Sequence, residues 1–427
     1  MINLLEKLIK EKRVLILGFG MEGKSTYNLL KKVGSFSALD IADKNPNISE
    51  EEAVVYSGDN YLDNIEMYDI VFKSPGIILP KNYKEYNCQI TSQTEVFLEH
   101  YNRQVIGITG TKGKSTVSTL IYHVLSSNNI PCILAGNIGK PVFDILDDIT
   151  PATILVLELS CHQLDICRFS PALSVFLNLY EDHLDHYKTF ENYARTKKNI
   201  YLHQHPLDIL YCDATVKPAV GESVSRAVIV DKTILPFDSF TAIDVVKLYG
   251  EHNLKNCAFV YSIAKTFSIT DDEFISSIRS YAPLRHRLEF IGNKEGIDFY
   301  DDSISTTNES TINAVKTIPN ASTVLVGGMD RGIDYTGLVE YLASSSLANI
   351  ICMYDSGKRI FEMLQSSQNV KPTANYCNTL YEAAELAQKI TPVGKACILS
   401  PAAASYGEFK NFEERGNMFR QLVIGDK

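Results

Sequence analysis

Residues 105–116, VIGITGTKGKST, decide the fold class of this 427-residue chain. A short apolar, β-branched run ends there in a glycine-rich loop, and the amphipathic stretch STVSTLIYHVLSS follows at residues 115–127. A strand, a loop that exposes backbone N–H groups and the N-terminus of a helix together form a ready site for phosphate groups. The segment therefore predicts a nucleotide-binding unit of the α/β type.

The same alternation of strand and helix continues along the whole chain. Apolar runs bounded by Gly, Pro or Ser, typical of buried strands, recur at residues 13–20, 68–76, 152–160, 173–179, 322–328, 349–356 and 395–402. Longer amphipathic stretches between these runs predict helices. The pattern predicts an α/β fold with mainly parallel sheets.

Two glycine loops and one proline divide the chain into three parts. Each loop, at residues 18–25 and 107–116, opens its own strand–loop–helix unit and is expected to begin a domain. A helical pattern ends at Pro283, where a basic stretch begins. We therefore expect domains at residues 1–102, 103–282 and 283–427.

Composition excludes several classes of protein. The chain carries 41 Lys and Arg against 51 Asp and Glu, a net charge of −10, which argues against sequence-independent binding of nucleic acid. No run approaches the length of a membrane span, and charged residues interrupt the N-terminus where a signal peptide is apolar. The nine cysteines include no CxxC pair, and the spacing of Cys161 and Cys167 matches no common metal motif. Free thiols and a cytoplasmic location are expected.

Context decides which of the two loops holds a nucleoside triphosphate. The first loop, GFGMEGKS, fits both the dinucleotide motif and the strict P-loop motif GxxxxGK[ST]. The second loop departs from the strict P-loop motif, because Ile108 stands at the position of its first Gly. A triphosphate site also needs a carboxylate for Mg²⁺. Glu158 ends the strand at residues 152–160, and Asn178, Asp182 and His183 follow the next strand. We therefore assign ATP to the second loop.

The first loop has a neutral partner, the turn Lys73-Ser-Pro-Gly76. Such a turn suits a diphosphate held by backbone groups without metal, so we assign a nucleoside diphosphate there. Plainer interpretations stay open for each feature. The first loop can be only a tight strand–helix turn, Glu158 a buried carboxylate with a cationic partner, and His183 a structural side chain. Lys197 and Lys198 can be ordinary solvated charges.

Eight motifs in register resemble the Mur ligases, ATP-dependent enzymes that append amino acids to the peptidoglycan precursor. The motifs are GTKGKST (110–116), LELSCHQLD (157–165), NLYEDHLDHY (178–187), GEHNLKN (250–256), LRHRLEF (284–290), DDSISTTN (301–308), VGGMDRGIDY (326–335) and LSPAAASYGEFKNFEERG (399–416). The unit ahead of the ATP loop and the last motif resemble the glutamate-adding members. The resemblance implies a Rossmann-like UDP-binding domain, a central P-loop ATPase-type domain and a Rossmann-like C-terminal domain that closes over the site.

The resemblance also implies a reaction. ATP phosphorylates the carboxylate of UDP-N-acetylmuramoyl-L-alanine, and the amine of glutamate attacks the acyl phosphate to form an amide, ADP and phosphate. Lys114 would neutralise the outer phosphates, and Ser115, Glu158 and His183 would hold two Mg²⁺ ions. Lys197 matches the family's carbamylated lysine, a further metal ligand, with Lys198 as the rival assignment.

Further site residues are implied one position at a time. Expected ATP contacts are Gly110, Thr111, Lys112, Gly113, Lys114, Ser115, Thr116, Asn253, Asn256, His286, Arg287 and Asp302. Expected contacts of the UDP substrate are Gly18, Gly20, Met21, Glu22, Gly23, Asp43, Lys44, Ser74, Gly76, Asn137, Ser160 and His183. Expected contacts of the amino acid are Thr306, Arg331, Ser405 and Phe412.

The amino-acid motifs depart from the family pattern. Ile304 or Ser305 stands where many members have Lys, one residue is inserted in DDSISTTN, and Ala403 replaces a common Cys. Arg331 replaces a common Lys and still suits a carboxylate. Glutamate therefore remains the expected substrate, with D-glutamate favoured and L-glutamate the alternative. A monomer is expected.

Three other classes compete with this interpretation. A dinucleotide-dependent oxidoreductase would use the first loop and leave Glu158 and His183 unexplained. A folate polyglutamate ligase shares the ATP core and lacks a full Rossmann-like unit ahead of it. An inactive UDP-sugar-binding regulator would not need the set of Lys114, Ser115, Glu158 and His183.

Overall fold

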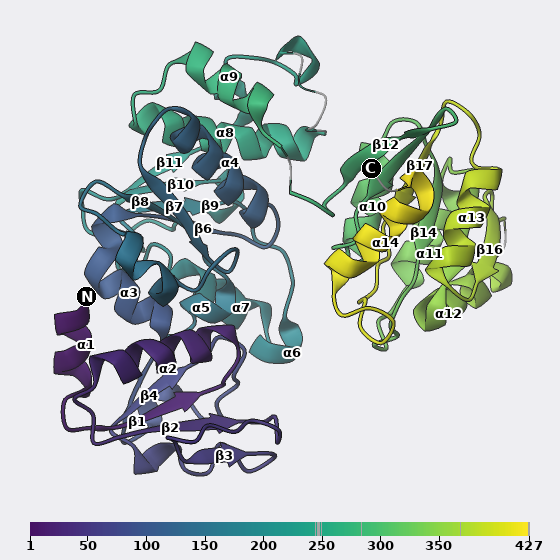
Figure 1. The fold of residues 1–427 in the computed structure, drawn as a ribbon. Helices are drawn as coiled ribbons and strands as arrows, with labels where there is room; N and C mark the ends of the chain where they lie inside the picture. The colour runs from purple at the N-terminus through teal and green to yellow at the C-terminus, as the bar shows by residue number, and fades with distance from the viewer. Residues whose placement is uncertain (244, 246–247, 249, 283, 368, 426–427) are drawn as a thin grey trace. The chain divides into compact units, whose positions relative to one another are not determined.

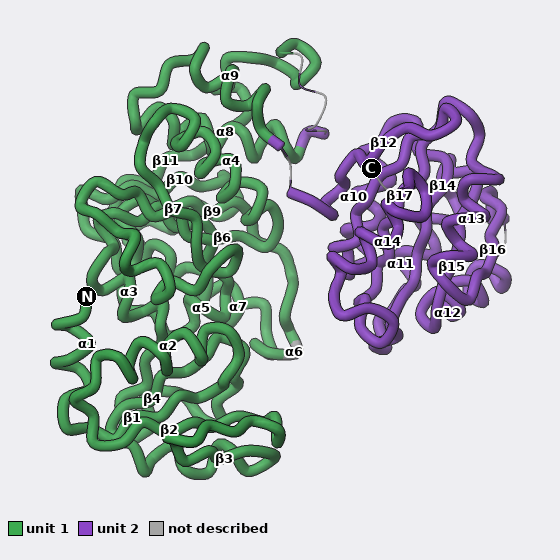
Figure 2. The backbone as a smooth tube through the Cα atoms, viewed as in Figure 1, with its two compact units in different colours: residues 1–243, 252–281 green, residues 244–251, 282–427 purple. Residues whose placement is uncertain are grey.

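The computed structural model describes residues 1–243, 245, 248, 250–282, 284–367 and 369–425. The chain forms two compact units (Figure 2). Unit 1 comprises residues 1–243 and 252–281, and unit 2 comprises residues 244–251 and 282–427. Each unit is described by itself.

Among the described residues of unit 1, the first sheet has five parallel strands in the order β3-β2-β1-β4-β5 (Figure 1). The strands are β1 (Arg13–Leu17), β2 (Ala38–Asp43), β3 (Val55–Ser57), β4 (Ile70–Lys73) and β5 (Gln89–Thr91). The helices are α1 (Ile2–Ile9), α2 (Met21–Val33) and α3 (Gln93–Tyr101). The strand order reverses between β1 and β4, although all five strands are parallel. α/β sheets bind ligands at such a switch point.

The second sheet of unit 1 has six described parallel strands in the order β11-β10-β9-β6-β8-β7. The strands are β6 (Val105–Thr109), β7 (Cys132–Gly136), β8 (Ile154–Glu158), β9 (Leu173–Phe176), β10 (Ile209–Cys212) and β11 (Arg226–Ile229). The helices are α4 (Lys114–Ser127), α5 (Cys161–Leu164), α6 (Leu184–Tyr187), α7 (Phe190–Lys198), α8 (Glu251–Thr266) and α9 (Asp271–Ser280). Since β6 lies between β8 and β9, the ends of all three strands meet at the second glycine loop.

The two sheets of unit 1 share one hydrophobic core. Buried Ile16 and Phe72 of the first sheet belong to the same cluster as Leu157 and Phe176 of the second. Polar contacts reinforce the junction, because the Ser25 hydroxyl on α2 donates to an Asp144 carboxylate oxygen at 2.6 Å. The two glycine loops are therefore carried by one continuous body.

Unit 2 holds a third sheet, whose described strands run in the order β12-β13-β17-β14-β15-β16. Its strands are β12 (Glu289–Lys294), β13 (Ile297–Asp301), β14 (Ala321–Val326), β15 (Asn349–Met353), β16 (Thr373–Cys377) and β17 (Ala396–Leu399). Its helices are α10 (Asn308–Thr317), α11 (Thr336–Ser344), α12 (Tyr354–Ser366), α13 (Leu380–Ile390) and α14 (Phe412–Ile424). β12 is antiparallel to β13, and the other described pairs are parallel. Buried clusters cover both faces of this sheet.

The predicted fold class, α/β with mainly parallel sheets, is confirmed. The strand predicted at 349–356 is shorter, because Tyr354 takes a left-handed φ of 60° and begins α12. The domain boundaries near 102 and 282 stay predictions, and Pro283 lies outside the described residues. No helix in the described part of the chain is long and apolar enough to cross a membrane.

Candidate functional site: a phosphate loop beside a buried carboxylate

The second glycine loop connects β6 to α4 through Gly110–Gly113. Gly113 precedes the helix with a left-handed φ of 85°. A Cβ atom at this position would lie 2.8 Å from the Asn256 Oδ1 atom on α8. Asn256 in turn donates to Asn253 Oδ1 at 3.1 Å. The structure thus brings Asn253 and Asn256, two expected ATP contacts on α8, to the loop expected to hold phosphates.

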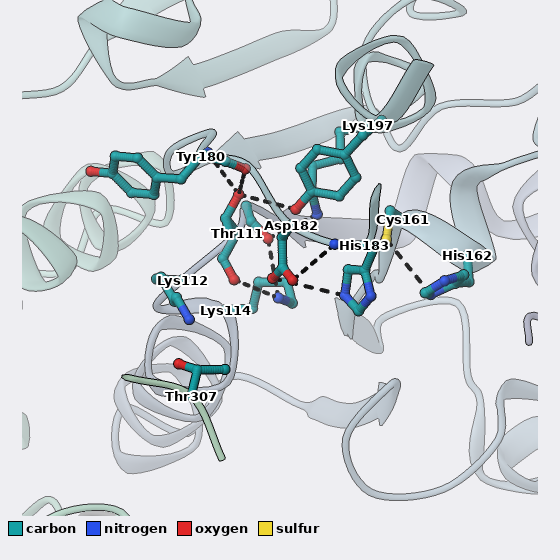
Figure 3. Close-up of polar contacts among 12 residues, drawn as sticks. Thr111, Lys112, Lys114, Cys161, His162, Tyr180, Asp182, His183, Lys197 and Thr307 are labelled. Carbon is teal, nitrogen blue, oxygen red and sulfur yellow. Dashed lines mark hydrogen bonds and ion pairs between the residues drawn. The ribbon is translucent and has the colours of Figure 1, made fainter. Parts of the chain in front are cut away.

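The segment after β9 fastens this loop on its other side. The Asn178 amide accepts from Lys112 N at 2.9 Å and donates to Lys112 O at 3.0 Å. The Thr111 hydroxyl accepts from Tyr180 N at 3.0 Å and lies 3.0 Å from the Tyr193 hydroxyl (Figure 3). The loop is therefore preorganised before any ligand arrives.

Lys114 folds back over the loop. Its Nζ atom donates to the carbonyl oxygens of Gly110 and Thr111, at 3.1 Å in each case. Because Lys114 is itself the first residue of α4, followed by Ser115 and Thr116, a cation and the helix N-terminus lie at the same point. This combination suits the outer phosphates of a nucleotide.

Glu158 ends β8 as a buried carboxylate, with 2% of its surface exposed. Its Oε1 atom accepts from Asn137 Nδ2 at 2.8 Å. Its Oε2 atom has no hydrogen-bond partner among the described residues. A buried carboxylate oxygen without a partner costs about 1–3 kcal/mol, more for a charged group, unless a cation compensates. The site therefore fits a Mg²⁺ ion, which prefers carboxylate and hydroxyl oxygens.

His183 lies at the start of α6 in a left-handed conformation, with φ of 54°. Its backbone N–H donates to Asp182 Oδ1 at 3.0 Å, and its Nε2 atom lies 3.8 Å from Asp182 Oδ2. Cys161 and His162 approach it from α5 (Figure 3). Burial, helped by the nearby His186 and His183 rings, lowers the pKa of His162 to about 4. Neither Cys161 nor His162 was expected at the site.

Lys197 and Lys198 have different surroundings. Lys197 is 1% exposed, donates to Gly110 O at 2.9 Å and lies 5.1 Å from the centre of the Tyr193 ring. Burial and the neighbouring Lys114 ammonium lower the pKa of Lys197 to about 7. Lys198 instead forms an ion pair with Glu222 at 2.6 Å. The environment of Lys197 favours a neutral, reactive amine beside the phosphate loop.

The first glycine loop is closed by residues that were expected to contact a ligand. The Ser74 hydroxyl donates to Gly18 O at 2.7 Å, and Asp43 Oδ2 accepts from Phe19 N at 2.6 Å. Gly23 packs so closely that a Cβ atom would lie 1.9 Å from Gly18 O. The glycine pattern here therefore serves the packing of α2 against β1 as well as any ligand.

Around this loop several predicted contacts are open to solvent. Met21 is 71% exposed, and Gly20, Lys44 and Gly76 are also exposed. These four residues remain available for a nucleotide. The expected binding of UDP by these residues stays a prediction.

Glu22 joins the two sheets instead of facing solvent. Its Oε1 atom accepts from Gln163 Nε2 at 2.6 Å. Burial raises the pKa of Glu22 to about 7, opposed by that hydrogen bond and by the charge of Lys73. Ser160 caps α5 and shares a capping box with Gln163. Sequence analysis missed Gln163, since nothing in the pattern marks a residue that joins two domains.

A cavity of about 530 Å³ lies between the two sheets of unit 1. Its basic lining includes Lys73, Lys81 and Arg168. Lys73 lies 3.7 Å from Asp165, and the other two pair with Glu66 and Glu95. Lys84 and Arg195 also line the cavity, so its lining carries positive charge beyond these three ion pairs. Of the expected UDP contacts, none lines the described part of this cavity.

In unit 2, the motif at residues 301–308 forms a dense polar turn. Asp302 Oδ2 accepts from the hydroxyls of Ser305 and Ser400, and Asp302 Oδ1 accepts from Leu288 N. Complete burial raises the pKa of Asp302 to about 6. His286 Nδ1 lies 2.6 Å from Asp301 Oδ2. The Asp302 carboxylate already has protein partners, and its role as an ATP contact stays a prediction.

Arg415 is the residue of unit 2 that sequence analysis overlooked. It is fully buried on α14, and its guanidinium donates to Ser303 Oγ, Ser303 O, Ala403 O and Ala404 O. It thus ties the 301–308 turn to the 399–416 motif. Only the tertiary structure reveals that this Arg faces inward.

The expected amino-acid contacts lie in different environments within unit 2. Thr306 and Arg331 are exposed, whereas Ser405 is buried. Phe412 begins α14, and its ring lies 6.1 Å from the His286 ring. Arg287 is half-buried beside His286. Binding of glutamate by these residues stays a prediction.

Comparisons with known proteins bear on the family of the chain. The model of the Mur ligase middle domain family matches residues 108–228. UDP-N-acetylmuramoylalanine–D-glutamate ligases from Clostridium kluyveri (30% identical over 98% of both chains), Acetivibrio thermocellus (31% over 99% of this chain and 98% of the relative) and Ruminiclostridium cellulolyticum (32% over 98% and 97%) are similar to this chain.

Two solved structures share the fold. MurF ligase from Thermotoga maritima in complex with ADP superposes with a TM-score of 0.61 at 17% identity and covers 99% of both chains. MurC from Thermotoga maritima superposes with a TM-score of 0.58 at 17% identity, over 97% of this chain and 100% of that one.

The fold and the phosphate loop beside a buried carboxylate define an α/β protein with a phosphate-binding loop. The full-length relatives make the assignment more specific. The chain belongs to the Mur ligase family. It is a ligase that forms a carbon–nitrogen bond, and the family predicted from its motifs is confirmed.

Proposed function

We propose that this protein joins D-glutamate to UDP-N-acetylmuramoyl-L-alanine with hydrolysis of ATP to ADP and phosphate, a step in peptidoglycan precursor synthesis. The observation that carries the proposal is identity of 30–32% to three D-glutamate ligases over 97% or more of every chain. The sequence similarity to these ligases therefore extends over both units of the chain. The oxidoreductase and the folate ligase interpretations account for none of these matches.

The chemistry begins with the carboxylate of the L-alanyl substrate. Its oxygen attacks the γ-phosphorus of ATP, and the bond to the β,γ-bridging oxygen breaks to release ADP. The Lys114 ammonium and the backbone N–H groups of the loop stabilise the charge on the phosphates. The fixed loop contacts at Asn178 and Thr111 support this role, because positioning supplies most of the catalysis in phosphoryl transfer.

Amide formation follows from the acyl phosphate. The glutamate amine attacks the carbonyl carbon, a tetrahedral intermediate forms, and the phosphate leaves while the amine loses a proton. Thr306, Arg331, Ser405 and Phe412 are the candidates for holding glutamate. An Arg side chain at position 331 suits a carboxylate through two parallel hydrogen bonds.

The residues beside the loop would hold Mg²⁺. Glu158 offers its unpartnered Oε2 atom, and Ser115, His183 and a carbamylated Lys197 would complete two metal sites. Bound Mg²⁺ offsets the repulsion between a carboxylate nucleophile and the ATP phosphates.

The test is ATP-dependent release of phosphate with UDP-N-acetylmuramoyl-L-alanine and either D-glutamate or L-glutamate. We expect turnover with D-glutamate. Turnover with L-glutamate alone would replace the proposed substrate by its enantiomer, and no turnover with either would overturn the proposal.

Matched variants connect this activity to the site. Glu158→Gln keeps the shape of the side chain and the contact with Asn137, and removes the negative charge. We expect it to lower kcat by at least about 100-fold, since electrostatic stabilisation of phosphoryl transfer depends on that charge. Glu51→Gln, an exposed carboxylate in unit 1, is the control. Equal activity of both variants would remove Glu158 from the mechanism.

A further inference from the structure

Three imidazoles and a thiol gather beside the phosphate loop. The Cys161 Sγ atom and a ring nitrogen from each of His162 and His183 lie within 4.8 Å of one another. The Cys161 Sγ atom lies 3.6 Å from His162 Nδ1. The His186 ring lies 4.5 Å from the His162 ring. Figure 3 shows Cys161 and His162 from one segment and His183 from another converging on one point.

The spacing of these atoms suits a tetrahedral transition metal. Bonds of about 2.3 Å from zinc to sulfur and about 2.0–2.1 Å to nitrogen place neighbouring ligand atoms roughly 3.4–3.6 Å apart. The separation of Cys161 and His162 already has this value. The ligand atom of His183 lies within 4.8 Å of the other two. Because its side chain is 45% exposed, a rotation of the side chain can bring the ring nitrogen closer.

The donor set discriminates between metals. Thiolate is a soft ligand and imidazole an intermediate one, and both suit Zn²⁺, whereas Mg²⁺ prefers oxygen. Cys161, His162 and His186 have no role in the ligation reaction proposed above. The convergence of Cys161 and His162 on His183 therefore calls for a separate explanation.

We propose that Cys161, His162 and His183 form a binding site for one Zn²⁺ ion, with His186, whose ring lies 4.5 Å from the His162 ring, as a source of a fourth ligand. The Cys161 thiol gives its proton to solvent when the metal binds. The consequence rests on the proposed function: Zn²⁺ held here occupies the imidazole of His183, a candidate ligand of Mg²⁺, and so inhibits the ligase.

Cobalt is the probe that reports the ligands directly. The full chain, reduced and freed of metal with a chelator, is titrated with Co²⁺ in the absence of nucleotide and UDP-sugar. We expect one Co²⁺ per chain with a thiolate-to-metal charge-transfer absorption, and stoichiometric loss of that absorption when Zn²⁺ is added. Excess Mg²⁺ should not remove it, because Mg²⁺ does not compete for sulfur.

Variants assign the signal to this site. Cys161→Ser should abolish the charge-transfer absorption, and His162→Phe should weaken the affinity by at least about tenfold. Cys132→Ser and His205→Phe are matched controls elsewhere in unit 1 and should keep wild-type affinity. Since Cys161 is buried, His162→Phe at a half-buried position also serves if Cys161→Ser fails to fold.

A second group of possible ligands, His286, Glu289 and Asp301, lies in unit 2 and contains no sulfur. Cobalt bound there lacks the charge-transfer absorption. No absorption in the wild type, or an absorption that both Cys161→Ser and His162→Phe retain, would overturn the proposal.

An activity measurement then tests the inhibition. With saturating Mg²⁺, Zn²⁺ should inhibit the wild type at a concentration at least about tenfold below that needed for His162→Phe. Equal inhibition of both would overturn the inhibitory role. Because metal binding is measured without substrates, failure of the ligase assay and failure of the zinc site give different results.

Discussion

Lys197 shows how one buried side chain acquires unusual chemistry. Its amine lies within 2.9 Å of Gly110 O and has a pKa of about 7, because burial and the Lys114 charge disfavour the ammonium form. An ordinary lysine, with a pKa near 10.4, is almost entirely protonated at neutral pH. Only the neutral amine reacts with CO₂, so position 197 is far better suited to carbamylation than position 198.

We therefore predict a carbamate on Lys197 and none on Lys198. Protein equilibrated with ¹³C-bicarbonate should show one carbamate carbonyl resonance by NMR. Lys197→Met should lose this resonance, whereas Lys198→Met, the adjacent control, should keep it. A resonance that survives in Lys197→Met would contradict the assignment.

Glu22 predicts a pH dependence of stability. Its pKa rises from 4.5 in the unfolded chain to about 7 in the fold, so the folded state retains the proton between these values. Stability then falls as pH increases through this window, by no more than about 3 kcal/mol. Glu22→Gln should flatten the slope in urea unfolding between pH 5 and pH 8. The control is Glu51→Gln, and an unchanged slope in Glu22→Gln would refute the prediction.

At the scale of elements, the phosphate loop depends on the order of three parallel strands. β6 lies between β8 and β9, so Glu158 and Asn178 meet a loop from a third strand. Gly113 precedes α4 with a φ of 85°. A Cβ atom added at this residue would lie 2.8 Å from Asn256 Oδ1. Any other side chain at residue 113 would therefore both strain the backbone and collide with Asn256.

Gly113→Ala should weaken ADP binding by at least about tenfold, which corresponds to about 1.4 kcal/mol. Isothermal titration calorimetry measures the effect. Gly221→Ala is the matched control, since Gly221 has φ of 82° and no atom within 4 Å of its Cβ position. It carries similar backbone strain away from the loop and should keep the affinity. Equal affinities of the two variants would show that the collision with Asn256 has no effect.

For the whole molecule, the important feature is that two units have separate hydrophobic cores. Arg415 secures the second unit by four hydrogen bonds to backbone and hydroxyl oxygens of two motifs. Removal of the Arg415 guanidinium leaves these buried oxygen acceptors without their hydrogen bonds. Lys lacks the planar fork that reaches them all.

Arg415→Ala should destabilise unit 2 by about 3–5 kcal/mol and leave unit 1 folded. Differential scanning calorimetry should show one transition shifted to lower temperature. Arg420→Ala, on the same helix with a partly exposed ion pair to Glu289, should cost less than about 1 kcal/mol. Loss of both transitions together in Arg415→Ala would contradict independent cores.

Sequence analysis identified the family, the α/β class and the phosphate loop. These depend on short-range patterns, in which strand, glycines and helix follow each other within about a dozen residues. It did not identify Cys161, His162 and His186 as one cluster, because they come from two segments that meet only in the fold. It also did not foresee that Glu22 and Ser74 form hydrogen bonds with Gln163 and Gly18; their contacts with the UDP substrate stay predictions.

By itself, the sequence determined which chemistry is available: a glycine loop, a lysine, a carboxylate at the end of a strand and the motifs of a Mur ligase. The tertiary structure alone decided which of those groups lack partners. Glu158 Oε2 has no hydrogen-bond partner among the described residues, whereas Asp302 Oδ2 accepts from Ser400. Lys197 is buried, and Lys198 forms an ion pair with Glu222. The physical reason is that burial and hydrogen bonding depend on neighbours distant in the chain, and these set the charge and reactivity of each group.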